Sequence, residues 1–158
     1  MALFSVMLGL GRSLYGKFGK NIEKVLLLGA IGSAICYFVS AISPFPALSL
    51  VSCAFTGFCA SMLWPGNLIS ATDRIPDGGV FLYAMMASGG DFGASVVPQM
   101  VGIVTDNVME WDSAVKLAES LNMSAEQLGM RCGMLIGALF PLAAIPIFLK
   151  FIKEKKKI

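Results

Sequence analysis

The feature that most constrains this chain is a series of long runs without charged residues. A helix needs about 20 predominantly apolar residues to cross the hydrocarbon core of a bilayer. In lipid such a run must be helical, because a helix satisfies its own backbone polar groups. The runs that reach or approach this length are Val25–Ile42, Pro46–Thr72 and Cys132–Leu149, which hold no charge, and Val80–Thr105, which holds only Asp91. The sequence therefore predicts an all-α, polytopic transmembrane helix bundle.

Composition excludes the ordinary soluble and disordered classes. Charged residues make up 14% of the chain, whereas a soluble domain carries about 25% to keep its surface hydrated. The 12 Lys and Arg against 10 Asp and Glu leave a net charge of +2. That bias is too small to indicate a nucleic-acid partner. We therefore expect the lipid bilayer as the main partner and no nucleic acid.

The residue types that carry most enzyme chemistry are scarce. The sequence has no His, which removes the commonest general base and metal ligand. The four Cys lie inside apolar runs without CxxC spacing, so we expect small buried packing residues. They are Cys36, Cys53, Cys59 and Cys132. We expect no enzymatic activity, no bound metal and no cofactor.

Proline, glycine and charge set the boundaries between the predicted segments. Met1–Tyr15 is apolar but only about 22 Å long as a helix, so we expect it to be the second half of a span. Ser124-Ala-Glu-Gln127 matches a capping box, and helical spacing from Trp111 to Leu121 predicts a short amphipathic helix. The predicted organisation is a partial span at 1–18, full spans at 22–42, 46–72, 79–105 and 125–152, and an extracytoplasmic loop at 106–123.

The distribution of Lys and Arg predicts the orientation. If the turns at 16–24 and 73–79 share a side with the C-terminus, that side carries ten of the basic residues. They are Arg12, Lys17, Lys20, Lys24, Arg74, Lys150, Lys153, Lys155, Lys156 and Lys157. Only Lys116 and Arg131 fall on the other side. By the positive-inside rule we expect an integral protein of the plasma (inner) membrane with a cytoplasmic C-terminus.

A polar stripe follows the predicted span around Pro65. Its members are Ser49, Ser52, Thr56, Ala60, Trp64 and Asn67. Pro65-Gly66 should kink this helix, because proline removes a backbone hydrogen bond and crowds the preceding turn. The stripe is consistent with a cavity wall, with Thr56, Trp64 and Asn67 as candidates, and equally with contacts between helices through Ser and Thr.

A second polar face lies on the predicted span that carries Asp91. Ser88, Asp91, Ser95 and Gln99 share this face, while nearby glycines offer a separate packing surface. A charge in mid-span costs at least about 2.5–3.5 kcal/mol on insertion scales. Asp91 should therefore face a cavity or a partner, or stay protonated. A coupling or substrate role and a purely structural hydrogen bond both remain open.

A segment rich in glycines and cations precedes the first full span. Its candidate residues are Arg12, Gly16, Lys17, Gly19 and Lys20. Small residues allow close helix approach, and the cations suit helix C-termini. A tight cytoplasmic turn explains the same pattern.

Three segments resemble the major facilitator superfamily of transporters. GLGRSLYGKFGKN resembles the loop between the eighth and ninth helices, although Gly16 and Lys17 stand where that signature has an acid and an arginine. SGGDFGASVVPQMVGIVTD resembles the eleventh helix. Trp64-Pro65-Gly66 followed by Asp73-Arg74 is similar to the end of the tenth.

The resemblance implies that the chain runs from the end of the eighth helix through the twelfth helix of a twelve-helix transporter. It would then form part of the C-terminal six-helix half and move a small solute by alternating access. Its implied partners are the missing N-terminal helices, a small-molecule substrate, and a proton or cation as the coupling ion. Two alternatives remain: a small four-helix protein that acts as an oligomeric exporter, and a non-transport scaffold.

Overall fold

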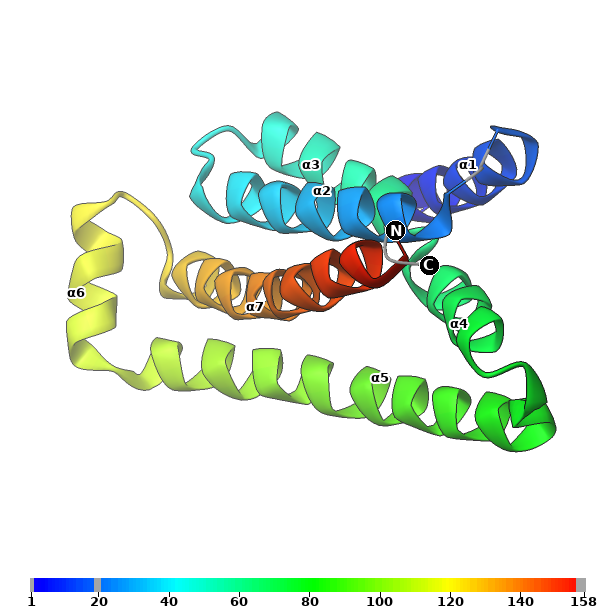
Figure 1. The fold of residues 1–158 in the computed structure, drawn as a ribbon. Helices are drawn as coiled ribbons and strands as arrows, with labels where there is room; N and C mark the ends of the chain where they lie inside the picture. Colours follow the sequence, from blue (N-terminus) through cyan, green and yellow to red (C-terminus); the bar gives the residue numbers. More distant parts are fainter. Residues whose placement is uncertain (1, 19–20, 156–158) are drawn as a thin grey trace.

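The computed structural model of the chain describes residues 2–18 and 21–155. These residues form helices joined by short connections (Figure 1). In chain order the elements are α1 (Ala2–Phe18), α2 (Ile22–Ile42), α3 (Pro46–Ala60), α4 (Leu63–Arg74), the 3-10 turn η1 (Pro76–Gly78), α5 (Gly79–Glu110), α6 (Asp112–Ser120) and α7 (Ala125–Lys155).

Four helical stretches are long and apolar enough to cross a membrane. They are α2, α3 together with α4, η1 together with α5, and nearly all of α7. This result confirms the predicted all-α class with its long apolar helices. It indicates a helical membrane protein.

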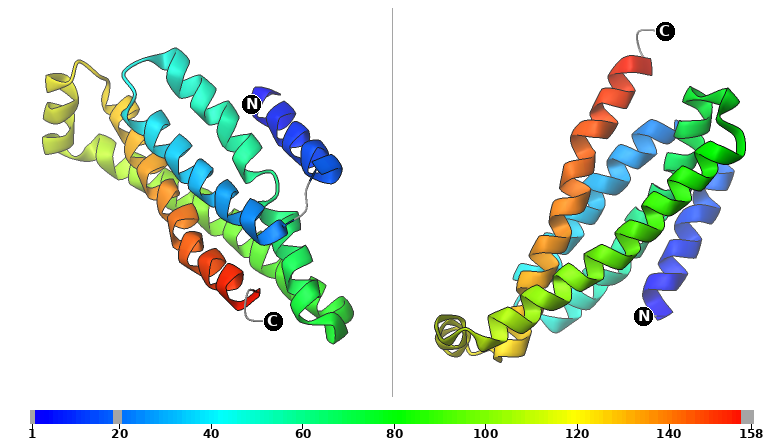
Figure 2. Two further views of the ribbon diagram at one scale, coloured as in Figure 1. Left: turned by 45° about the horizontal axis from the view of Figure 1, so that its top comes forward. Right: turned by 90° about the horizontal axis from the view of Figure 1, so that it is seen from below.

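The helices form a bundle in which α2 and α7 run side by side (Figure 1). On one side α3 packs against α2, and α1 packs against α3; on the other side α5 packs against α7. Short α6 lies at one end of the bundle. The C-terminal part of α7 and the connection from α4 to α5 lie together at the opposite end (Figure 2).

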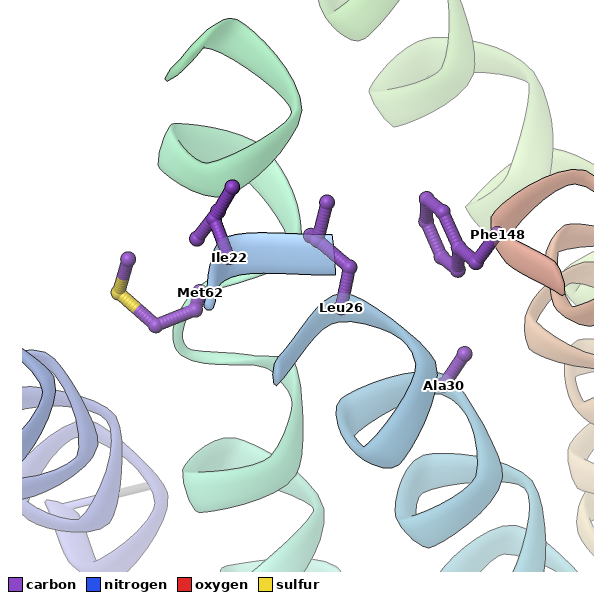
Figure 3. Close-up of a cluster of buried hydrophobic side chains, with 5 residues drawn as sticks. All are labelled: Ile22, Leu26, Ala30, Met62 and Phe148. Atoms are coloured by element: carbon purple, nitrogen blue, oxygen red, sulfur yellow. The ribbon is translucent and has the colours of Figure 1, made fainter. Parts of the chain in front are cut away.

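The bundle has a small apolar core. Its buried members are Ile22, Leu26 and Ala30 of α2, Met62 between α3 and α4, and Phe148 of α7 (Figure 3). Many other large apolar side chains are exposed, and α5 has no buried residue at all. Water would penalise so much exposed apolar surface, whereas lipid tails are as apolar as these side chains.

The expectation that all four Cys are buried is wrong. Cys53 is exposed, and Cys36, Cys59 and Cys132 are half-buried. A thiol that faces lipid leaves no polar group in need of water, because Cys behaves as a small apolar residue. An apolar run in a membrane helix therefore does not reveal which of its residues face inward.

Pro65 has the predicted effect on the second span. α3 ends at Ala60 and α4 begins at Leu63. Proline lacks the N–H that would bond to the carbonyl of Ser61, four residues earlier, and its ring crowds that carbonyl. The helical pattern resumes where the N–H of Gly66 donates to the carbonyl of Met62 at 2.8 Å.

α5 extends beyond the predicted span. Residues 106–110, which we expected in the loop, continue the helix to Glu110. Neither Gly nor Pro interrupts this part of the chain, and the Asn107 side chain donates to the carbonyl of Ile103 at 2.7 Å. Pro98 also lies inside α5 without ending it.

The connection from α6 to α7 uses two local motifs. Asn122 adopts a left-handed conformation with φ of 52° just after α6, and the N–H of Met123 reaches back to the carbonyl of Ala118 at 2.9 Å, as in a Schellman motif. The N–H of Gln127 then donates to Ser124 Oγ, and the N–H of Ser124 donates to Gln127 Oε1, both at 3.2 Å. These bonds confirm the predicted capping box.

Candidate functional site

A cavity of about 640 Å³ lies between the long helices. We call it the central cavity. Its walls are mainly apolar, and α1 contributes Phe4 to them. Its polar side chains are Ser33 and Tyr37 of α2, Thr56 of α3 and Asn67 of α4. A concave apolar site with a few polar groups is typical of small-molecule binding.

The hydroxyl groups of Ser33 and Thr56 differ in how they are satisfied. Thr56 Oγ1 donates to the carbonyl of Ser52 in its own helix at 2.9 Å. Ser33 is 2% exposed, and its Oγ has no partner in the described part of the chain. A buried hydroxyl without a partner costs about 1–3 kcal/mol. Ser33 therefore lies in the wall of the central cavity with its hydroxyl buried, and a polar occupant would satisfy this group only after the side chain rotates toward the cavity.

The polar stripe around Pro65 serves two purposes. Thr56 and Asn67 line the central cavity, as a cavity wall would. Ser49 Oγ instead donates to the carbonyl of Ser40 on α2 at 3.2 Å, so it joins two helices. Trp64 does not line the cavity; it lies over α5, where a Cβ added to Gly90 would come within 2.9 Å of Trp64 Nε1.

The polar face of α5 lies apart from the central cavity. Ser88, Asp91, Ser95 and Gln99 are all exposed. Ser88 Oγ donates to the carbonyl of Ala84 at 2.8 Å, and Ser95 Oγ to that of Asp91 at 2.9 Å, so both hydroxyls are satisfied within the helix. α5 lines the cavity with Val97, Pro98 and Val101 instead. The structure therefore does not bring the α5 candidates together with Thr56 and Asn67.

Arg12 meets the break between α3 and α4. Its Nε donates to the carbonyl of Ser61 at 3.2 Å. This is the carbonyl that Pro65 leaves without an intrahelical donor. Pro65 by itself indicates that the carbonyl of Ser61, four residues earlier, lacks an intrahelical donor. Nothing in the sequence, however, links that carbonyl to Arg12.

The rest of the glycine- and cation-rich segment is described only in part. Gly16 has open space where a Cβ would stand, so no helix packs closely there. Lys17 lies in the last turn of α1. Gly19 and Lys20 lie outside the described residues.

An ion pair joins two distant parts of the chain. Arg74 Nη1 at the end of α4 lies 2.8 Å from Glu154 Oε2 on α7. The Arg74 guanidinium also lies 3.9 Å from the centre of the Phe151 ring and donates to the Phe151 carbonyl at 3.3 Å. No local pattern predicts this pairing, because the residues are 80 positions apart.

The described residues contain no group of three His, Cys, Asp or Glu side chains that could hold a metal ion. Comparison of the chain with models of protein families, with curated proteins and with solved structures finds no match. The arrangement itself offers a mid-bundle cavity with a few hydrogen-bonding groups, and a long helix with an exposed acid. The four long apolar helices that carry these features indicate a helical membrane protein.

Proposed function

We propose that this chain is part of a secondary active transporter that moves a small solute across a membrane by alternating access. The observation that carries the proposal is the central cavity between membrane-length helices, whose mainly apolar wall includes Ser33, Tyr37 and Asn67. Transporter sites of this kind lie near the bilayer midplane between helices. The resemblance of three segments to the major facilitator superfamily supports the same class.

The exposed face of α5 supports the view that further helices of the transporter pack here. Asp91 is exposed near the middle of a helix that has no buried residue. A carboxylate facing lipid is expensive, so an intramembrane acid normally faces a partner or a water-filled cavity. In the proposed transporter the N-terminal helices cover this face.

The coding sequence that precedes this chain tests the proposal directly. The superfamily resemblance requires further apolar spans in frame upstream, about seven of them if the architecture is the usual one. Purified chain alone, reconstituted in liposomes, should then take up no solute. Saturable uptake by the isolated chain would contradict the proposal.

Asp91 tests the coupling role in the complete transporter. Asp91→Asn keeps the shape and a hydrogen-bonding group but cannot exchange a proton. We expect normal expression, loss of accumulation against a gradient, and retained exchange of substrate. Ser95→Ala is the matched control, because Ser95 Oγ is satisfied within its own helix. Normal accumulation by Asp91→Asn would leave that carboxyl with a structural role only.

A small oligomeric membrane protein is the second candidate. One observation favours it: Gly89 and Gly93 on α5 have open space where a Cβ would stand, and this spacing allows close approach of a second membrane helix. If α5 pairs with another copy, a cysteine at position 93 in a cysteine-free chain should form disulfide-linked dimers in membranes. The transporter proposal expects no such dimers.

A further inference from the structure

A second cavity adjoins the central one. It has a volume of about 420 Å³ and lies between α4, α5 and α7. We call it the end cavity, because Arg74 and Phe151 line it where α4 and α7 approach their C-terminal ends. The two cavities share Asn67, Ala144 and Phe148 in their walls. They are therefore neighbours along the bundle, separated by the side chains that belong to both.

Each cavity contains one buried hydroxyl without a hydrogen-bond partner. Ser33 lines the central cavity and Ser70 lines the end cavity. Both side chains are 2% exposed, and neither Oγ has a partner in the described part of the chain. The helices surround them with apolar groups, so no bulk solvent satisfies these hydroxyls.

A hydroxyl without a hydrogen-bond partner is unusual among the helices of this protein. Other hydroxyls of its membrane-length helices donate to the carbonyl four residues earlier: Thr56 at 2.9 Å, Ser88 at 2.8 Å and Ser95 at 2.9 Å. Ser33 and Ser70 have the same local option but do not use it. Buried polar groups in native proteins are nearly always satisfied, by ordered water where no protein group is available.

Polar groups continue along one face of α4 from one cavity to the other. Asn67, Ser70 and Arg74 are spaced three and four residues apart, which places them on the same side of a helix. All three line the end cavity, and Asn67 also lines the central cavity. A water molecule in the end cavity would thus find Asn67 and Arg74 as polar partners, which meets the minimum of two that it needs, and the Ser70 hydroxyl would join them once its side chain rotates toward the cavity.

An aromatic side chain lies between the two cavities, and an ion pair closes the end cavity at its outer limit. Phe148 is 4% exposed and packs with Leu26 and Ala30 of α2 (Figure 3); it also lines both cavities. At the outer limit, the ion pair between Arg74 and Glu154 joins α4 to α7 beside Phe151. The side chains of this ion pair are 33% and 45% exposed, so they are open to the surroundings at the end of the bundle.

We infer that the two cavities form one water-holding path through the bundle, from Ser33 past Asn67 and Ser70 to the Arg74–Glu154 ion pair. Its ligand is water, and Phe148 is the partition between an outer hydrated section and an inner one. The path gives the central cavity a connection to one membrane surface. Its use as a substrate or proton route rests on the proposed transport function, whereas its hydration does not.

Thiol accessibility tests the path without any transport assay. Ser70→Cys and Ser33→Cys are introduced separately into the chain after its four native Cys are replaced by Ala, and the variants are studied in sealed membrane vesicles. The probe is a small, membrane-impermeant methanethiosulfonate reagent, which reacts with the thiolate that forms in water. The matched control keeps only native Cys53, which is exposed on the outside of α3 and would face lipid.

The path predicts that Ser70→Cys reacts at least about tenfold faster than the Cys53 control. The cysteine at position 70 should react when the reagent is added to the same side of the membrane that labels a cysteine at position 153. Ser33→Cys should react slowly from that side. Its rate should rise about tenfold when Phe148→Ala removes the partition. Phe148→Leu fills more of the space and should raise the rate less.

Labelling of Ser70→Cys no faster than the Cys53 control would overturn the inference. So would a Ser33→Cys rate that Phe148→Ala leaves unchanged in protein that still elutes as folded material. The result is independent of the proposed function. A chain that moves no solute can still show the path, and an active transporter with a protected Ser70→Cys would refute the path alone.

Discussion

The carbonyl of Ser61 lacks a donor in its own helix and accepts a hydrogen bond from Arg12 on another helix. Pro65 leaves the carbonyl of Ser61 without its intrahelical partner, and Ser61 is only 4% exposed. Arg12 Nε supplies a donor at 3.2 Å, in a region where lipid and apolar side chains offer none. A hydrogen bond from a charged donor is stronger than a neutral one. The guanidinium therefore stabilises the break between α3 and α4.

This arrangement predicts a coupling between Arg12 and Pro65. Arg12→Ala leaves the Ser61 carbonyl unsatisfied and should lower the free energy of unfolding by about 1–3 kcal/mol. In a Pro65→Ala background, residue 65 regains an N–H that can bond to Ser61, so the same Arg12→Ala change should cost less. Equilibrium unfolding of the four proteins in mixed micelles gives the coupling energy. Additive effects would show that Arg12 does not act through this carbonyl.

α1 and α3 approach each other closely at two glycines. A Cβ on Gly11 would overlap Ser61 Oγ, and a Cβ on Gly57 would lie 2.5 Å from the carbonyl oxygen of Phe4. Both contacts involve atoms that cannot move far, because the Cβ on Gly11 would also lie 2.7 Å from Ser61 Cβ, and the Phe4 oxygen belongs to the backbone. Small residues at such contacts let membrane helices pack through their backbones.

Gly11→Ala should therefore separate α1 from α3. We expect a loss of about 1–3 kcal/mol, which is typical of overpacking, and a lower unfolding temperature in detergent. Gly9→Ala is the matched control, because a Cβ at Gly9 meets nothing within 4 Å; it should be neutral or slightly stabilising, since Ala favours helix more than Gly. Equal effects of the two substitutions would show that the close approach does not matter to stability.

The start of α7 depends on the capping box. Ser124→Ala removes the side-chain acceptor for the N–H of Gln127, which is 3.2 Å away, and should cost about 1 kcal/mol. Ser120→Ala is a suitable control, since Ser120 Oγ donates to Leu117 at the end of α6 and caps no helix start. Hydrogen exchange at residues 125–128 should rise in Ser124→Ala and stay unchanged in the control. An unchanged exchange rate in both variants would contradict the cap.

The molecule as a whole presents apolar side chains outward along its length. Val80, Phe81 and Phe92 of α5 are 86%, 74% and 71% exposed. α6 and the C-terminal end of α7 lie at opposite ends of the bundle (Figure 2). By the positive-inside rule we expect the end with Arg74, Lys150 and Lys153 to face the cytoplasm.

Single cysteines at positions 112 and 153 test this orientation in a chain without the native Cys. In intact cells a membrane-impermeant thiol reagent should label the cysteine at 112, at the start of α6, and leave the cysteine at 153 unlabelled. Permeabilised cells are the control and should label both. Labelling of position 153 alone in intact cells would reverse the orientation.

The sequence by itself determined the class of this protein and much of its local structure. Charge-free runs predict long helices because a membrane leaves the backbone no other way to satisfy its polar groups. Local chemistry also suffices for the break caused by Pro65 and for the capping box at Ser124, since both depend on residues within four positions of each other.

Only the tertiary structure decided which polar residues face one another. The sequence identified Thr56 and Asn67 as candidates for a cavity wall, but it gave no reason to join them to Ser33 or to separate them from Asp91 and Ser95. Lipid is as apolar as the helix interior, so hydrophobic periodicity does not distinguish inward from outward faces in a membrane helix. The pairing of Arg74 with Glu154, like the bond from Arg12 to Ser61, arises from contacts between helices that are distant in sequence. Such contacts follow from packing, and no local pattern encodes them.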